Sequence, residues 1–116
     1  MNREELVMIC CSDLSGHVKG KACPTADLEK RRSSGIGWVP TNAQITAFNN
    51  IADSPFGSLG DLLLIPDSDA EARVDFGDGS PLEHFFMGNI TYTDGRPWEC
   101  CLRSCLINAL ETLKAE

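Results

Sequence analysis

Six cysteines carry the most reactive side chains of this sequence. They are Cys10, Cys11, Cys23, Cys100, Cys101 and Cys105. Cys101 and Cys105 stand four residues apart in a segment with helical periodicity, but neither a C-x-x-C pair nor a nearby histidine completes a zinc or redox site. Since cysteine is most often a small buried hydrophobe, we expect reduced thiols that mostly belong to the core. The residues expected there are Cys10, Cys11, Cys23 and Cys105.

Carboxylates and histidines are the next residues with possible chemistry. The carboxylates crowd into one segment as Asp67, Asp69, Glu71, Asp75 and Asp78. Counted from the first of them, the sixth position of an EF-hand loop is Ala72 instead of glycine, so the pattern favours a solvated acidic strand edge over a metal site. His17 and His84 share no local nucleophile and base motif.

No phosphate-binding loop is encoded either. The Gly35-Ile36-Gly37 segment lacks the third glycine and the helix of a dinucleotide fingerprint, and no G-x-x-x-x-G-K occurs. The residues alone therefore predict no catalytic residue and no metal ligand in this chain.

Length and composition describe one small globular domain over residues 1–116. The chain has 42% hydrophobic residues and a net charge of -7, so an ordered core is expected and nucleic-acid binding is not. No stretch approaches the roughly 20 apolar residues of a membrane span, and the acidic N-terminus is unlike a signal peptide. We expect a soluble cytoplasmic domain without a nucleic-acid or membrane partner.

Hydrophobic patterning predicts the elements that position these groups. Residues 6–11 and 17–23 form a hairpin around a turn at residues 12–16, and residues 26–32 form a short helix capped by Thr25 and ended by Gly35. Residues 36–59 form an irregular excursion with one turn near residues 44–48. Strands follow at residues 61–66, 70–76 and 82–93. A C-terminal helix after Pro97 has its apolar residues on one face.

This order predicts an α+β domain with a β-grasp-like mixed sheet, a short helix and a C-terminal helix.

Five segments, in order, resemble the amino-terminal β-grasp domain of the glutamine synthetase family. The family pattern runs Asp-x-x-Gly-x-x-(Arg/Lys)-Gly-Lys, Gly-(Phe/Trp), a strand ending in Leu-x-Pro-Asp, a turn Asp-Gly, and a helix opened by Pro-Arg. The matching residues are Asp13-Leu14-Ser15-Gly16-His17-Val18-Lys19-Gly20-Lys21, Gly35-Ile36-Gly37-Trp38, Gly60-Asp61-Leu62-Leu63-Leu64-Ile65-Pro66-Asp67, Asp94-Gly95-Arg96-Pro97 and Arg103. The resemblance covers nearly the whole chain.

The resemblance implies an ATP-dependent glutamate-amine (γ-glutamyl) ligase whose catalytic domain is absent from this chain. In the family, ATP phosphorylates the γ-carboxylate of glutamate and an amine displaces the phosphate. ATP and magnesium or manganese are implied for the parent enzyme, and no cofactor for this fragment. The implied partners are the catalytic domains of the same and of a neighbouring subunit in a homo-oligomeric ring, so the fragment alone is expected to be inactive.

Two departures from the family pattern concern the acceptor site and the last helix. The family places an aspartate after the aromatic residue of the Gly-Phe segment, near the incoming ammonium ion, whereas Val39 follows Trp38 here, and Leu102 replaces the proline before Arg103. We therefore expect Trp38, Thr41 and Asn42 to line the acceptor side of the parent enzyme and to favour a substituted amine.

Three alternatives stay open at this point. Asp53, or a carboxylate of the absent domain, takes the missing aspartate's place and ammonia remains the substrate. The chain is instead a freestanding β-grasp binding module that uses the loop at residues 38–56. A thiol-based redox or metal protein is the third possibility.

Overall fold

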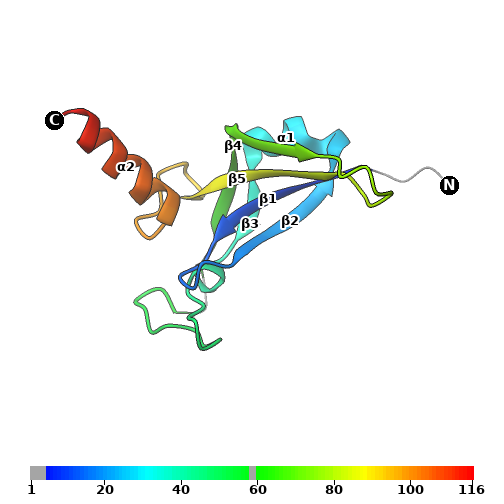
Figure 1. The fold of residues 1–116 in the computed structure, drawn as a ribbon. Helices are drawn as coiled ribbons and strands as arrows, with labels where there is room; N and C mark the ends of the chain where they lie inside the picture. Colours follow the sequence, from blue (N-terminus) through cyan, green and yellow to red (C-terminus); the bar gives the residue numbers. More distant parts are fainter. Residues whose placement is uncertain (1–4, 58–59) are drawn as a thin grey trace.

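A single curled sheet, covered on one face by a short helix, forms the body of the molecule (Figure 1). The computed structural model describes residues 5–57 and 60–116. The elements run β1 (Leu6–Ser12), β2 (Val18–Pro24), the 3-10 turn η1 (Thr25–Asp27), α1 (Leu28–Ser34), β3 (Ile36–Trp38), the 3-10 turn η2 (Pro40–Ala43), β4 (Leu62–Val74), β5 (Glu83–Tyr92) and α2 (Leu102–Lys114). The predicted α+β class with a β-grasp-like mixed sheet is confirmed.

The five strands lie in the order β2-β1-β5-β4-β3. β1 and β5 pair in parallel and the other neighbours are antiparallel, so the N-terminal and C-terminal strands meet at the centre. Because successive side chains of a strand point to opposite faces of the sheet, one set of side chains lies on the face that α1 covers. The most deeply buried residues there are Val7, Ile9, Leu64, Phe86 and Ile90.

α1 covers this face at one end, where Leu28 packs against Val7 and Phe86. Its predicted C-terminal stop is confirmed: the Gly35 N–H donates to the Arg31 carbonyl oxygen at 2.8 Å. The predicted cap is wrong, because the Thr25 hydroxyl donates to the Glu5 carbonyl oxygen at 3.0 Å and belongs to η1. The hydroxyl therefore ties the segment before the helix to the residue directly before β1.

The two strands expected at residues 61–66 and 70–76 are one strand, and the prediction of two is wrong. β4 runs continuously against β5, with its register shifted between Pro66 and Glu71. Such an irregularity lets a strand bend without ending. The residues between the two predicted strands, Asp67, Ser68 and Asp69, lie at this irregularity.

The excursion predicted at residues 36–59 begins with ordered structure. Its first three residues form β3, which pairs with β4, and η2 follows. A turn then closes over residues 46–49, where the Asn49 N–H donates to the Thr46 carbonyl oxygen at 3.0 Å. Residues 58 and 59, the end of the predicted excursion, lie outside the described residues.

α2 leaves the sheet at the end of β5 and extends away from it (Figure 1). Among the helices of residues 5–57 and 60–116, none is long and apolar enough to cross a membrane.

Gly35 permits a close approach of α1 to β4. Its φ is +67° and its ψ is -170°, a region that is essentially restricted to glycine. A β-carbon there would lie 2.5 Å from Ile65 Cδ1 and 3.0 Å from the Leu64 carbonyl oxygen. Both backbone strain and a clash therefore oppose a side chain at this position.

We predict that Gly35→Ala lowers the free energy of unfolding by about 2–4 kcal/mol, the sum of backbone strain and overpacking. Gly37→Ala is the matched control, because a β-carbon at Gly37 meets nothing within 4 Å, and it should change stability by less than about 0.5 kcal/mol. Urea denaturation of both variants measures the difference. Equal losses would contradict the packing argument.

Candidate functional site

The excursion between β3 and β4 is the main irregular region of the molecule and projects from one end of the sheet (Figure 1). It folds back on itself: Ile45 and Ile51 form a β-bridge, and the Ala52 N–H donates to the Gln44 carbonyl oxygen at 2.9 Å. Within it, Pro40 and Ala43 of η2 are buried. The excursion is thus a structured loop with its own backbone hydrogen bonds.

Two contacts fix the excursion to the sheet. The Leu14 N–H in the β1–β2 turn donates to the Ala43 carbonyl oxygen at 3.2 Å. At the other side, the rings of Phe56 and Trp98 meet edge to face with centroids 5.2 Å apart, a favoured aromatic geometry. Trp98 is 1% exposed and connects the loop to the segment before α2.

Asp13 organises the β1–β2 turn from a buried position. Its Oδ1 accepts hydrogen bonds from the Ser15 N–H at 3.0 Å, the Ser15 hydroxyl at 2.6 Å and the His17 N–H at 2.9 Å. Its Oδ2 lies 2.9 Å from Lys19 Nζ. The hydrogen bonds from Ser15 and Lys19 hold the pKa of the Asp13 carboxyl well below its usual range.

The sequence motif that begins at Asp13 continues to Lys21, and Lys21 closes the curl of the sheet. Lys21 on edge strand β2 donates from Nζ to the Gly37 carbonyl oxygen of β3, the opposite edge strand, at 2.6 Å, and lies 5.6 Å from the centroid of the Trp38 ring. Gly20 stands between the lysines because a β-carbon there would collide with the Ile9 carbonyl oxygen and lie 2.8 Å from Cys10 Sγ. The motif therefore has a structural role in this chain.

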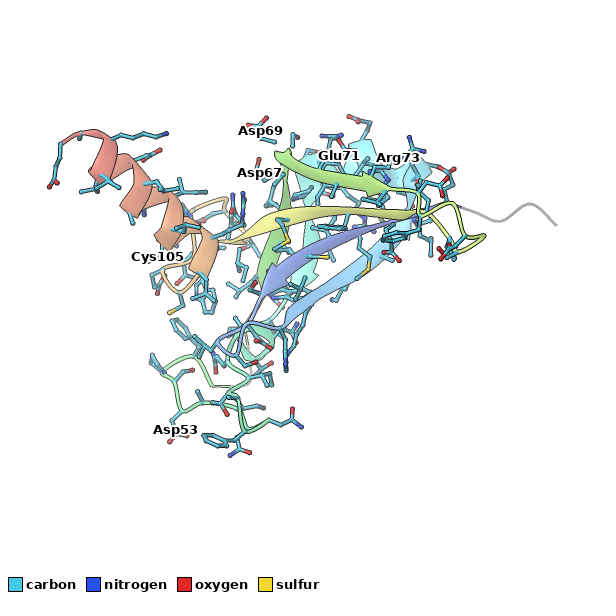
Figure 2. All side chains as sticks on the ribbon, viewed as in Figure 1. Asp53, Asp67, Asp69, Glu71, Arg73 and Cys105 are labelled. Atoms are coloured by element: carbon cyan, nitrogen blue, oxygen red, sulfur yellow. The ribbon has the colours of Figure 1, made fainter. Side chains whose placement is uncertain are left out.

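A pocket of about 280 Å³ opens within the excursion. Its lining residues are Thr41, Gln44, Ile51, Ala52, Asp53, Ser54 and Gly57. Figure 2 shows Asp53 in the excursion, at the far end of the molecule from Asp67 and Asp69. A carboxylate, a hydroxyl and an apolar wall in one pocket are suited to binding an amine.

The three predicted acceptor-side residues occupy different positions around this pocket. Thr41 lines it, whereas Asn42, the next residue of η2, is half-buried and is not part of the lining. Trp38 is 4% exposed and belongs to the hydrophobic core, so it supports the base of the loop. The structure brings Thr41 together with Asp53, the carboxylate that the alternative interpretation named.

The sequence did not point to Gln44 and Trp98, two buried residues that line pockets of the excursion. Gln44 is buried and lines both the 280 Å³ pocket and a second pocket of about 150 Å³, which Trp98 also lines. The aromatic residue directly after the Asp-Gly-Arg-Pro segment was the available signal for Trp98. Nothing local marks Gln44, because only the folding of the excursion buries it.

The acidic segment does not gather into a metal site in the described part of the chain, where no three His, Cys, Asp or Glu side chains are placed to hold an ion. Asp67 Oδ2 lies 2.8 Å from Arg103 Nη1, and Glu71 Oε1 lies 2.8 Å from His84 Nε2. Figure 2 shows Asp67, Asp69 and Glu71 following β4 instead of converging on one point.

The expectation for the cysteines is correct for Cys10, Cys11 and Cys23 and wrong for Cys105. Cys105 is exposed because α2 leaves the sheet after its first turn. Cys101 is buried instead, and its Sγ accepts a hydrogen bond from the Ile90 N–H at 3.2 Å. Burial raises the pKa of the Cys11 thiol to about 12.

Comparison with known proteins identifies the family. The family model described as the glutamine synthetase N-terminal domain matches residues 1–98. The chain belongs to this family. Among solved structures, the crystal structure of a novel glutamine synthase homolog is 38% identical with a TM-score of 0.92, over 99% of this chain and 28% of that one. This glutamine synthetase N-terminal domain thus spans less than a third of the homolog's length.

Two further structures share the fold alone. GmaS without ligand gives a TM-score of 0.59 at 22% identity, over 82% of this chain and 20% of that one. The GmaS complex with ADP gives 0.64 at 22% identity, over 94% of this chain and 24% of that one. The comparison with curated proteins gave no match.

We predict that Asp13→Asn lowers the melting temperature near neutral pH, because the amide loses the ion pair with Lys19. A carboxyl with a depressed folded-state pKa stabilises above its unfolded pKa of about 4 and loses that contribution as the pH falls toward the folded value. The difference in melting temperature between wild type and variant should therefore narrow below about pH 4. Melting curves from pH 7 to pH 2 measure it, with exposed Asp27→Asn as control. A gap independent of pH would be inconsistent with this role.

We predict two classes of thiol. Cys100 and Cys105 are exposed and should react with a bulky thiol reagent at pH 8 in the folded chain, whereas Cys10, Cys11, Cys23 and Cys101 should react only after denaturant is added. Mass spectrometry of the labelled peptides distinguishes the classes. Native labelling of Cys11 at the rate of Cys105 would refute the assignment.

Proposed function

We propose that this chain is the N-terminal domain of a glutamine synthetase-like ATP-dependent γ-glutamyl ligase and is inactive alone. The observation that carries the proposal is the family match over residues 1–98, together with 38% identity to a glutamine synthase homolog across 99% of this chain. In this proposal the catalytic domain follows Glu116 in a longer polypeptide. The protein works in the cytoplasm as a homo-oligomeric ring.

ATP and magnesium or manganese belong to that catalytic domain in our proposal. The described residues of this chain do not fit either group: Asp67 and Glu71 of β4 pair with Arg103 and His84, no three acidic, His or Cys side chains are placed to hold an ion, and the sequence has no phosphate-binding loop. No catalytic step is therefore assigned to these residues. The contribution of this domain is to bind and to orient.

The excursion is proposed to close over the active site of a neighbouring subunit and to supply the acceptor side. Asp53 takes the place of the aspartate that is missing after Trp38, because it shares a pocket with Thr41. The Asp53 carboxylate provides the anionic contact that an ammonium or alkylammonium ion needs. The Thr41 hydroxyl oxygen accepts a second hydrogen bond from an N–H of the same ion. Asn42 flanks Thr41 in η2, and Trp38 holds the base of the loop.

The apolar part of the lining bears on the choice of amine. Ile51 and Ala52 stand beside Asp53 in the lining of the pocket, and an alkyl substituent gains from contact with such a wall. We propose a substituted amine as the preferred acceptor. Steady-state kinetics of the full-length protein with ammonia and a panel of alkylamines test this, and a higher kcat/KM for ammonia than for every amine would refute it.

We predict that Asp53→Asn in the full-length protein raises KM for the amine by about 10–100-fold, since a hydrogen bond to a charged group contributes about 1.5–3 kcal/mol. KM for glutamate and for ATP should change little. Asp69→Asn, at the far end of the molecule (Figure 2), is the control for loss of a surface charge. An amine KM within twofold of wild type would remove Asp53 from the acceptor site.

The same assay separates the proposed function from the alternative of a freestanding binding module. ATP-dependent γ-glutamyl product from the full-length protein, and none from the 116-residue chain, is the expected result. A gene without a catalytic domain after Glu116, or a full-length protein without ligase turnover, would leave the binding module instead.

A further inference from the structure

The second pocket, of about 150 Å³, lies between the excursion and the segment before α2. Its apolar wall consists of Leu14, Ala43, Ala52 and Phe56. An apolar cavity of this volume holds a molecule the size of benzene, with about six non-hydrogen atoms, and is several times larger than the share of one water molecule. The pocket therefore has room for a small organic ligand.

Two buried side chains in the lining carry an N–H group without an acceptor. Gln44 is 6% exposed and Trp98 is 1% exposed, and both line the pocket. Neither Gln44 Nε2 nor Trp98 Nε1 has a hydrogen-bond partner among the described residues. A buried donor without an acceptor costs free energy and is uncommon in native proteins. Two such donors in one pocket indicate a ligand that brings a hydrogen-bond acceptor.

Backbone contacts hold the two residues in place. The Gln44 carbonyl oxygen accepts a hydrogen bond from the Ala52 N–H at 2.9 Å, and the Trp98 N–H donates to the Ile90 carbonyl oxygen at 3.0 Å. The Trp98 ring also meets the Phe56 ring edge to face. Because these contacts exist before any ligand arrives, little ordering of the protein is needed on binding.

The charge of the lining selects the class of ligand. Asp53 contributes a carboxylate, and none of the described residues that line the pocket is Lys, Arg or His. A ligand carboxylate would meet this anion without a cation to balance it, in a chain of net charge -7. An ammonium ion has no lone pair to offer the two N–H groups. A primary carboxamide has both an acceptor oxygen and N–H donors, and it carries no charge.

We propose that this pocket binds a small uncharged primary carboxamide. The carbonyl oxygen, which has two lone pairs, accepts hydrogen bonds from Gln44 Nε2 and Trp98 Nε1. The amide N–H groups donate to the Asp53 carboxylate, and a short alkyl group contacts the apolar wall. Isobutyramide, with about six non-hydrogen atoms, matches the volume of the pocket and is the probe. The site goes beyond the proposed function, since it does not depend on ligase turnover of a longer protein.

The indole N–H signals of the 116-residue chain test the site, because the chain has two tryptophans. In proton–nitrogen NMR spectra, isobutyramide should shift the Trp98 indole signal saturably. The Trp38 signal should stay in place, since Trp38 Nε1 is also buried and unpaired in the described structure but Trp38 lies outside the lining. Trp38→Phe removes one signal and so assigns both. Isobutyrate, a carboxylate of the same shape, should shift neither signal at the same concentration.

A substitution of Gln44 tests the second donor. Gln44→Leu should raise the dissociation constant of isobutyramide about 5–10-fold through the loss of one hydrogen bond. Asn50→Leu, the same kind of replacement at an exposed residue of the excursion outside the lining, should not change it. Titration of the Trp98 signal gives each constant.

Four outcomes would overturn the carboxamide site. They are a shift of both indole signals, a shift of neither, an equal response to isobutyrate, and an unchanged affinity in Gln44→Leu. If Gln44→Leu fails to fold, the comparison of isobutyramide with isobutyrate on the unaltered chain still decides. Ligase kinetics are not used in this test, so its failure would leave the proposed function unaffected.

Discussion

The buried carboxylate of Asp13 and the two lysines that follow it are the constraint on which the shape of this domain depends. A buried charge is costly unless it is paired and hydrogen-bonded. Asp13 meets this condition with two N–H groups, one hydroxyl and one ammonium group, all from the next six residues. That requirement sets the form of the β1–β2 turn and the position of Lys19.

The same turn reaches the excursion. The Leu14 N–H donates to the Ala43 carbonyl oxygen, so the base of the loop is tied to the turn that Asp13 organises. Lys21 extends the constraint across the sheet by binding the Gly37 carbonyl oxygen. The motif at residues 13–21 therefore stabilises the sheet and the base of the excursion. The excursion in turn carries the pocket around Asp53.

The two ends of the domain have different roles in this arrangement. The excursion faces outward with polar groups and a pocket, which suits a contact with substrate or a neighbouring active site. α2, at the other end, presents a row of exposed leucines. Arg103 holds α2 at its angle through Asp67 of β4 and Asn89 of β5, so Asp67 of the acidic segment has a structural use.

The sequence by itself determined the hairpin, the short helix and its stop at Gly35, the C-terminal helix and the family motifs. These depend on periodicity and turn chemistry within a few residues. Only the tertiary structure decided that β4 is continuous across its bulge, that Cys101 and not Cys105 is buried, and that Thr41 and Asp53 share a pocket while Trp38 lies in the core. Each of these is decided by contacts between residues far apart in sequence, where burial and strand register depend on the whole sheet and leave no local pattern.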